Sequence, residues 1–343
     1  MQSIFFNLWD NHSKIKTILK YPLKNNKIVI CGVEEYEIFP HIRSMFTEKI
    51  KKQLKKNNNR VYFCFGSAEL DKYTEFDKFK YHCPNNNTFV FLWPTFWINR
   101  TVAQNINFFS EFFIKNYKKD FSKCKIVYPY ICMNNVAKYH RCLMIDLLAK
   151  ESLLDKGAVS WRNFHVDSSY KWKYTKPKLK KLSDFEKYNS NTYNLQFTPP
   201  DEFNESFMSI VTETTTDIIF ITEKTATALL YKQPFVVQGA VGFHGYLKTL
   251  GFELYDEIFD YSFDQEIDLE KRTKMIIDNV KSIADRDLYE LYSIIKSKLN
   301  FNHNRMIEIS QDKSLIPKLI LDNKHTRELY HSEIDINYIT NGE

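Results

Sequence analysis

Glycine is scarce in this sequence, and several features that define familiar classes of protein are missing. The 343 residues include only 8 glycines beside abundant Lys, Asn, Ile, Tyr and Phe, a bias typical of AT-rich viral or microbial genomes. The six cysteines form no Cys-x-x-Cys pair, and several lie in apolar strand patterns, where a thiol packs as a small hydrophobe, so disulfides are not indicated. No apolar run reaches the roughly eighteen residues of a transmembrane helix, so no membrane span is expected.

The N-terminus and the charge balance indicate where the protein is expected to act and what it is expected to bind. Residues 1–14 are too short and too polar for a secretory signal, so we expect a cytoplasmic protein, in the host cytoplasm if the source is viral. The net charge of +6 is spread over 48 basic and 42 acidic residues, whereas a nucleic-acid-binding protein usually concentrates its charge. The basic cluster 49–56 is interpreted as a solvated helix face. For the cluster 171–181 a flexible surface loop is favoured over contact with a polyanion.

The first third of the chain alternates strand and helix patterns. Hydrophobic residues make up 43% of the chain, enough for a sizeable core. Strand-helix alternation predicts a parallel sheet that is covered on both faces. The expected strands are 27–31, 60–65 and 88–93, and the expected helices are 39–56 and 102–117.

The pattern starts again near residue 122. A strand at 125–133 contains Pro129, which belongs at an edge or entry position because it cannot donate to a ladder. Residues 168–200 are polar and rich in proline, so a long loop is expected there. The other elements are a turn at Asn134-Asn135, helices at 137–151, 222–231 and 246–250, strands at 207–211 and 235–238, and helical patterns over 269–299.

These patterns predict an α/β protein with two Rossmann-like domains that face a cleft. The first domain is expected over residues 1–121 and the second over 122–300. Residues 301–343 are expected to form a tail that packs back or is partly extended.

Residues 211–246 carry the strongest functional pattern. Glu213 stands between threonines, and Thr222-Glu223-Lys224 follows at the head of a helical pattern. A threonine cap, the N–H groups of a first helical turn and a lysine together favour a phosphate. The Glu223 carboxylate would repel that phosphate, but it can accept hydrogen bonds from two ribose hydroxyls. The pattern predicts a nucleoside diphosphate site, and an ordinary capped helix with exposed charges is the alternative.

A second cluster follows the first strand of the second domain. The turn contains Asn134, and the helix after it carries Lys138, His140 and Arg141. Ligands of an open α/β sheet bind at the carboxyl ends of strands, where this turn and the loop at Gly239 are expected. Arg141 offers a planar fork of donors to a diphosphate, and an ordinary surface residue is the alternative. His140 is interpreted as a half-buried structural histidine.

The order of these motifs resembles the donor-binding half of the α-1,3-fucosyltransferases, which are GT-B glycosyltransferases. In that family an acidic-Asn-Ser segment precedes a Tyr/Phe-Ile/Val-Thr/Ser-Glu-Lys helix start and a Pro-Val-Val strand. The counterparts here are Glu213-Thr214-Thr215, Phe220-Ile221-Thr222-Glu223-Lys224 and Pro234-Phe235-Val236-Val237, with Arg141 matching the family's phosphate-binding arginine. The resemblance covers residues 125–280, and the threonines lack the amide of the family's asparagine.

The resemblance implies transfer of a sugar from a nucleotide-diphosphate sugar, GDP-fucose by default, to a hydroxyl of a glycan or other acceptor, with inversion. The nucleotide sugar is a co-substrate, and neither a cofactor nor a metal is expected. Arg141 and Lys224 would neutralise the leaving diphosphate, and Glu223 would hold the ribose. Glu213 would orient the sugar or the base. The expected donor site comprises Asn134, Arg141, Glu213, Thr222, Glu223, Lys224 and Gly239.

The general base is expected in the N-terminal domain, which carries no motif of the family and would bind the acceptor. Glu34, Glu35 and Glu37 follow the first buried strand, and repulsion between adjacent carboxylates can raise a pKa there. His41 is a second candidate. The acidic first turn of a helix is the alternative, and it has no catalytic meaning.

Two other functions stay open from the sequence. One is a non-catalytic nucleotide- or glycan-binding module that keeps the same scaffold. The other is a viral transferase that acts on DNA bases, which only the basic cluster 171–181 favours. Trp93 and Trp97 can stack on a sugar ring or pack in the core.

Overall fold

The structure of the protein is a computed structural model. It describes residues 3–7, 27–33, 47–69, 88–99, 101–102, 121, 125–164, 169–175 and 200–315. The described chain forms two four-stranded sheets, and all paired strands in both sheets are parallel. Helices join successive strands in the described parts, so the predicted α/β class is confirmed.

The chain divides into two compact units that are not contiguous in sequence. Unit 1 comprises Met1–Phe108, Ile218–Ile221 and Ser310–Glu343, and unit 2 comprises Phe109–Asp217 and Thr222–Ile309. The sequence placed the main boundary near residue 121 and a separate tail after residue 300. In the structure the chain instead returns to unit 1 for the short segment 218–221 and again from Ser310 onward.

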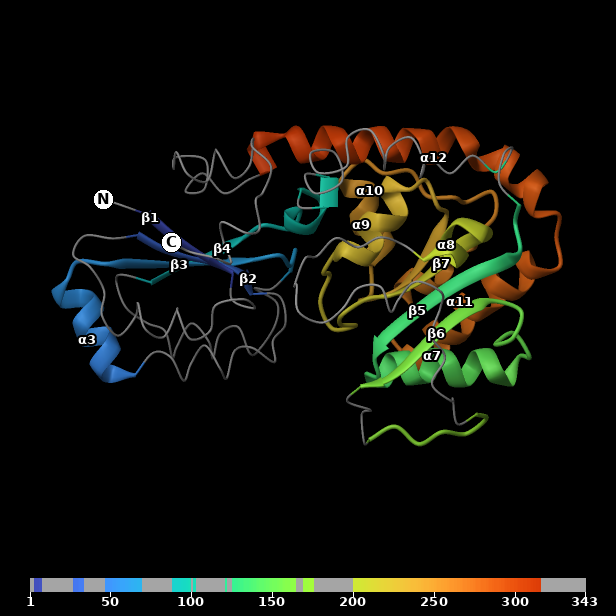
Figure 1. Ribbon diagram of the computed structural model, residues 1–343, viewed down its shortest axis with the longest axis horizontal. Coiled ribbons are helices and arrows are strands. Elements are labelled where there is room, and N and C mark those ends of the chain that lie inside the picture. Colours follow the sequence, from blue (N-terminus) through green and yellow to red (C-terminus); the bar gives the residue numbers. More distant parts are fainter. Residues whose placement is uncertain are drawn as a thin grey trace. The chain divides into compact units, whose positions relative to one another are not determined.

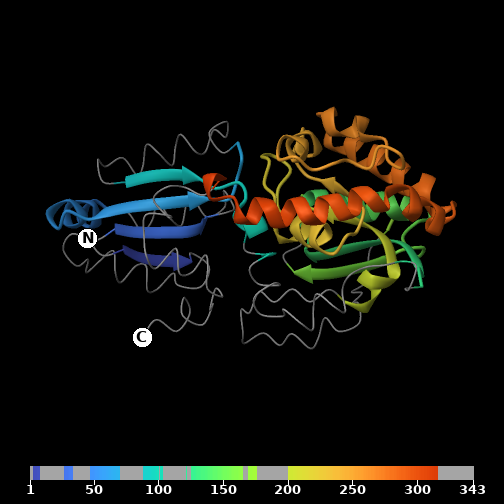
Figure 2. The same cartoon turned by 90° about the horizontal axis from the view of Figure 1, so that it is seen from above.

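Unit 1 is built on the sheet β1-β2-β3-β4, whose strands lie side by side and point the same way (Figure 2). The third strand, RVYFCF, is apolar almost throughout and buried after its first residue, as a strand covered on both faces requires. The helix before it begins at the cap Thr47, whose hydroxyl accepts from the N–H of Ile50. The elements are β1 (Ser3–Asn7), β2 (Lys27–Val33), α3 (Glu48–Lys56), β3 (Arg60–Phe65) and β4 (Thr88–Leu92).

The segment Ile218–Ile221 joins unit 1 through the residues that follow β3. The carbonyl of Ile219 accepts hydrogen bonds from the N–H of Ala68, at 3.0 Å, and from the Ser67 hydroxyl, at 3.2 Å. A Cβ atom on Gly66 would lie 2.9 Å from the Phe220 ring. The missing side chain at Gly66 therefore makes room for the inserted segment.

Unit 2 holds the second sheet, with the strand order β6-β5-β7-β8. Its strands are β5 (Tyr128–Val136), β6 (Ala158–Phe164), β7 (Ser206–Thr212) and β8 (Phe235–Gln238). Its helices are α7 (Tyr139–Lys150), α8 (Asp201–Glu205), α9 (Glu223–Leu230), α10 (Phe243–Thr249), η3 (Tyr261–Gln265), α11 (Leu269–Ala284) and α12 (Leu288–Gln311), the last of which ends in unit 1. A short 3-10 turn, η4, follows at Lys313–Leu315.

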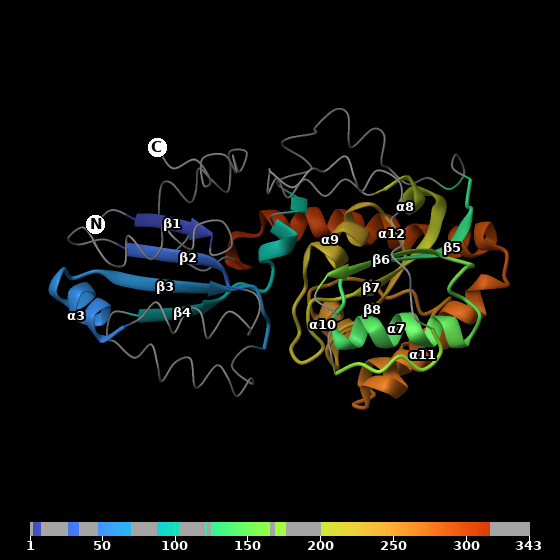
Figure 3. The same cartoon turned by 60° about the horizontal axis from the view of Figure 1, so that its bottom comes forward.

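Helices cover both faces of the sheet in unit 2. Figures 1 and 3 show α7 and α11 on one side of the sheet, and α9 and α12 on the other. Because both faces are covered, β7 and β8 are buried at every position. The helix α7 is itself buried from His140 to Leu148. Such a helix lacks the polar outer face of an ordinary surface helix.

A buried carboxylate on α7 anchors the segment 169–175. Asp146 is 1% exposed, and its two oxygens accept four hydrogen bonds from that segment. The donors are the Tyr170 hydroxyl and the main-chain N–H groups of Lys173, Tyr174 and Thr175, at 2.8 to 2.9 Å. The first part of the basic cluster 171–181 is therefore a surface loop held in place by α7, and residues 176–181 lie outside the described residues.

Replacing Asp146 with Asn tests this anchor. The amide presents two donors where N–H groups need an acceptor, so buried donors lose their partner and the variant should be less stable by about 1–3 kcal/mol. Urea unfolding measures the difference. The matched control Asp278→Asn lies on an exposed turn of α11 and should stay within about 0.5 kcal/mol of the parent. Equal stability of the two variants would contradict the anchor.

Two predicted boundaries need correction, and one strand was missed. Asn134 and Asn135 belong to β5 instead of a turn, because the Asn134 side chain accepts a hydrogen bond from Thr212 of the neighbouring strand, at 2.9 Å. The helical patterns over 269–299 are two helices, α11 and α12, but α12 continues past the predicted end at residue 299 to Gln311. The strand β6 was not predicted from the sequence. Pro129 is the second residue of β5, where pairing with β7 has begun at Tyr128 but pairing with β6 begins only at Ile131.

Candidate functional site

The strand order of unit 2 places a topological switch point between β5 and β7. From β5 the chain crosses through α7 to β6 on one side, and from β7 it crosses through α9 to β8 on the other. The two crossing helices cover opposite faces of the sheet (Figure 3). Ligands of open α/β sheets bind at such a point, outside the carboxyl ends of the strands. The residues at the ends of β5 and β7 therefore form the candidate site.

Glu213, the residue directly after β7, is 0% exposed. One carboxylate oxygen accepts from the N–H of Thr222, at 3.2 Å, and from the Thr225 hydroxyl, at 2.6 Å. The other oxygen accepts from the Thr222 hydroxyl. Thr222 is the N-cap of α9, and its own hydroxyl accepts from the N–H of Lys224. The carboxylate predicted to orient a sugar thus lies inside the protein, where it fixes the start of α9.

The main-chain carbonyl of Glu213 binds the first turn of α7. His140 Nε2 lies 2.8 Å from that oxygen, and Arg141 Nη2 lies 3.1 Å from it. Arg141 also donates to the carbonyls of Thr212 and Val136, at 3.3 and 3.1 Å. Through these bonds Arg141 links the end of β5 to the end of β7. Its side chain is only 4% exposed, so it lies beneath the surface of the candidate site.

His140 is neutral in this setting. Burial, together with the nearby Arg141 guanidinium, lowers the pKa of His140 from 6.5 to about 3, although the hydrogen bond to Glu213 opposes the shift. A carbonyl oxygen only accepts, so the proton of the neutral ring lies on Nε2. The interpretation of His140 as a structural residue agrees with these contacts.

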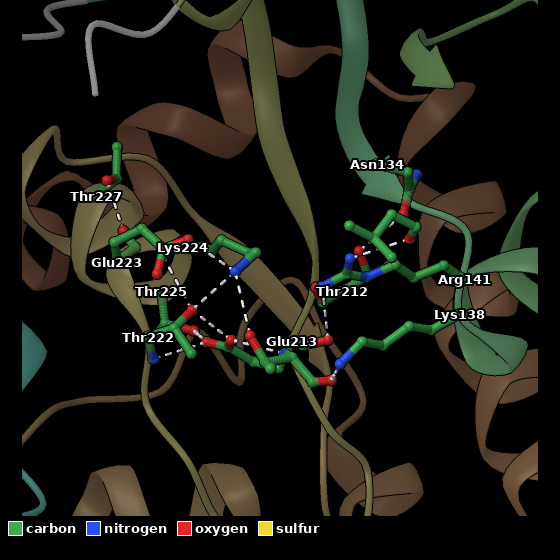
Figure 4. Close-up of polar contacts among 12 residues, drawn as sticks. Asn134, Lys138, Arg141, Thr212, Glu213, Thr222, Glu223, Lys224, Thr225 and Thr227 are labelled. Carbon is green, nitrogen blue, oxygen red and sulfur yellow. Dashed lines mark hydrogen bonds and ion pairs between the residues drawn. The ribbon is translucent and has the colours of Figure 1, made fainter. Parts of the chain in front are cut away.

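Two lysines meet at Thr214, the second residue after β7. Lys138, the N-cap residue of α7, reaches the Thr214 carbonyl with its Nζ at 3.1 Å. Lys224, in the first turn of α9, lies with its Nζ 3.5 Å from the Thr214 hydroxyl. Figure 4 shows the two side chains on either side of Glu213. Two positive charges and the N-terminus of α7 therefore gather at the switch point, while the buried Glu213 carboxylate already occupies the N-terminus of α9.

Glu223 forms an ion pair with its neighbour Lys224. The Nζ atom of Lys224 lies 2.8 Å from a carboxylate oxygen, and the two side chains remain 29% and 25% exposed. Burial raises the pKa of Glu223, but Lys224 and the more distant Arg141 outweigh it and hold the pKa below its usual range. Glu223 is thus ionised, and the partly exposed pair is one that a ligand can reorganise.

The other two residues of the predicted donor site, Asn134 and Gly239, contact only neighbouring parts of the protein in the interactions described next. Asn134 is 2% exposed; its amide group bonds to Cys132 and to the Thr212 hydroxyl. Gly239 follows β8, and a Cβ atom there would lie 2.9 Å from the Phe243 ring. Its lack of a side chain allows α10 to pack closely against the end of the strand.

Of the candidate residues in the N-terminal domain, the structure describes Trp93 and Trp97. Glu34, Glu35, Glu37 and His41 lie outside the described residues, so their proposed roles stay predictions. Trp93 and Trp97 are 7% and 6% exposed, and Phe96 contacts both rings edge-on. Of the two interpretations given for these tryptophans, their contacts agree with packing in the core.

Sequence reasoning left two residues out of the site. Lys138 was noted in the sequence beside His140 but was given no role. Its position between the end of a strand and the first turn of the next helix could have indicated one. Thr225 stands three residues after the helix cap, a spacing that brings a side chain back to the helix start. No sequence rule indicates that its partner is Glu213, twelve residues earlier in the chain.

No group of three or more His, Cys, Asp or Glu side chains within the described ranges could hold a metal ion. No helix of that part of the chain is both long and apolar enough to cross a membrane. Comparisons of the chain with family models, with curated proteins and with solved structures found no match.

Acid should destabilise the protein through His140. The unfolded histidine binds a proton near pH 6.5, whereas the folded one does so only near pH 3, so between these values the unfolded state binds more protons. Lowering the pH from 7 to 5 should therefore reduce the free energy of unfolding by about 2 kcal/mol from this residue. In His140→Gln, which keeps a donor but does not titrate, urea unfolding should depend less on pH. Parallel pH profiles would contradict the assignment.

Two threonines of α9 provide a matched test of the Glu213 carboxylate. The Thr225 hydroxyl donates to that buried charge, whereas the Thr227 hydroxyl donates to the carbonyl of Glu223 within the helix. Thr225→Val should lower the stability by about 1–3 kcal/mol, because a hydrogen bond to a charged group is lost. Thr227→Val should cost less than about 1 kcal/mol. Thermal and urea unfolding measure both, and the reverse order would overturn the role given to Glu213.

Proposed function

We propose that unit 2 binds a nucleotide-diphosphate sugar at the switch point between β5 and β7, and that the protein is a metal-independent glycosyltransferase. The observation that carries the proposal is the meeting of Lys138 and Lys224 at Thr214, at the ends of two parallel strands. Two ammonium groups and the N-terminus of α7 suit a diphosphate, whose charge they would stabilise. The resemblance of the sequence to the α-1,3-fucosyltransferases makes GDP-fucose the default donor and inversion the default outcome.

The residues divide between binding the ligand and supporting the site. Lys224 and Lys138 would neutralise the diphosphate as it leaves the sugar, which is the largest electrostatic demand of the reaction. Glu223 would turn from Lys224 to accept hydrogen bonds from the ribose hydroxyls. Arg141, assigned to the diphosphate by sequence, has its guanidinium bonded to main-chain carbonyls. It would add positive potential from behind and hold the strand ends at a fixed spacing.

The acceptor and the general base are assigned to unit 1, the division of roles typical of GT-B transferases. Glu34, Glu35 and Glu37 directly follow β2 in the chain, and one of them would remove the proton of the acceptor hydroxyl. The oxygen of that hydroxyl would form the new bond to the anomeric carbon, and the nucleoside diphosphate would leave.

Binding of the sugar nucleotides of GDP, UDP, CMP, ADP and dTDP, with no metal added, tests the proposal by calorimetry and thermal shift. One of them should bind, and Lys224→Ala should weaken that binding at least roughly tenfold, since a charge-assisted contact to phosphate is lost. Lys138→Ala should act in the same direction. Turnover of the bound donor should be lost in Lys224→Ala.

The matched control is Lys248→Ala, which removes an exposed lysine of α10 and should leave binding unchanged. If none of the donors binds the parent protein, the proposal fails. Binding without transfer or hydrolysis would identify a nucleotide-binding module instead of an enzyme. DNA binding that weakens steeply with salt, with no donor binding, would favour the nucleic-acid alternative.

A further inference from the structure

Arg272, in the first turn of α11, has a buried guanidinium that is only partly hydrogen-bonded. The residue is 3% exposed, and its Nη1 atom donates to the main-chain carbonyl of Glu266, at 2.6 Å. The Nε atom is buried and has no hydrogen-bond partner in the part of the chain that the structure describes. The edge that joins Nε to Nη2, which is the edge that binds two oxygens at once, therefore stays free. Buried donors are almost always paired in native proteins, so this edge has the character of an unfilled site.

The surroundings of the guanidinium are acidic. Burial lowers the pKa of Arg272, and nearby carboxylates oppose that shift. Four carboxylates lie close enough to interact with its charge, and they belong to Asp264, Glu266, Asp217 and Asp268. Three of them already accept hydrogen bonds at the starts of α10 and α11. Asp217 is the fourth, and it differs from the others.

The Asp217 carboxylate is exposed and, within the described ranges, forms neither a hydrogen bond nor an ion pair. Its main-chain N–H donates to the Thr215 hydroxyl, at 3.2 Å, which shapes the loop after β7. Asp217 and Arg272 attract each other, yet they do not meet as an ion pair. A free acceptor and a free donor edge held apart in this way suit a group that bridges them.

Hydroxyl groups fit both sides of this arrangement. A hydroxyl oxygen can accept from the Arg272 edge, and a hydroxyl proton can be donated to the Asp217 carboxylate. An anion would suit only Arg272 and would face four negative charges, whereas a cation would be repelled by the guanidinium. A neutral sugar carries several hydroxyls on one ring. The chemistry of the pair therefore favours a sugar over a further phosphate.

The chain limits how far Asp217 can lie from the phosphate site. Thr214, where Lys138 and Lys224 meet, belongs to the same loop. Three residues of fully extended chain span at most about 11 Å, which bounds the distance between the Cα atoms of Thr214 and Asp217. In a nucleotide sugar the transferred sugar is bonded directly to the diphosphate, so it is the neutral, hydroxyl-rich group closest to the lysine pair.

We propose that Asp217 and Arg272 form the subsite for the transferred sugar, with Asp217 accepting from its hydroxyls and Arg272 donating to them. The inference rests on the proposed function and extends it, because it assigns residues to the sugar of the donor. The lysine pair and Glu223 would bind the nucleoside diphosphate of every donor alike. Asp217 and Arg272 would then distinguish a nucleotide sugar from the nucleoside diphosphate that remains after transfer.

Calorimetry with two probes tests the subsite: the nucleoside diphosphate that the parent protein binds, and the corresponding nucleotide sugar. The ratio of the two affinities is the readout, because removing a negative charge can change both affinities equally. Asp217→Ala should weaken the nucleotide sugar about tenfold relative to the nucleoside diphosphate, since hydrogen bonds to a charged group are lost. Arg272→Lys keeps the charge but loses the planar fork, so it should shift the ratio in the same direction.

Asp278→Ala is the matched control. Asp278 is an exposed carboxylate of α11, the helix that carries Arg272, and its removal should leave the ratio unchanged. Because Asp217 is exposed, Asp217→Ala should fold, and its thermal unfolding checks this. Should the buried position of Arg272 not tolerate lysine, the ratio in Asp217→Ala decides alone.

An unchanged ratio in Asp217→Ala would overturn the subsite while leaving the proposed function standing. Equal weakening of both probes would overturn it as well, because the residue would then act on the nucleotide instead of the sugar. A series of donors that each lack one sugar hydroxyl adds a second check: one member should bind the parent and Asp217→Ala with the same ratio to the nucleoside diphosphate. Failure of every nucleotide to bind the parent protein would remove both proposals together.

Discussion

A carboxylate buried at the end of β7 is the constraint on which the candidate site depends. Removing the Glu213 charge from water costs several kcal/mol unless donors replace the lost solvation. Thr222 and Thr225 supply those donors, so α9 can begin only where its first turn encloses the carboxylate. The carbonyl oxygen of the same residue accepts hydrogen bonds from His140 and Arg141 of α7. One residue thus sets the start of both helices that flank the switch point.

This arrangement separates the charges that hold the site from those that can meet a ligand. Arg141 is buried, and its guanidinium bonds to main-chain carbonyls, so its charge acts as a fixed background potential. Glu223 and Lys224 retain partial exposure and can exchange their mutual contact for contacts to a ligand. The buried groups bring no reorganisation cost when a ligand arrives, which is the advantage of a preorganised polar site.

Hydrophobic periodicity was sufficient to predict most of the strands and helices. Local motifs identified only some of the residues of the candidate site. The strands β3 and β8 have the predicted bounds because continuous apolar runs between polar turns have few alternatives. Thr222 was recognised as a helix cap for a local reason. Sequence did not reveal that Asn134 would satisfy its amide across the sheet and so prolong β5. Nor did it reveal that Glu213 and Arg141 would face inward, since burial of a charge depends on partners that are distant in sequence.

The discontinuity of unit 1 has a consequence for how this protein can be divided. The chain leaves unit 2 after Asp217, contributes Ile218–Ile221 to unit 1 and returns at Thr222. The loop that carries Thr214 therefore shares its covalent path with a segment that unit 1 requires for its own packing at Gly66. No single cut separates the two units into complete pieces. Exchange of either half by recombination would disrupt both, so the two units are expected to be inherited as one block.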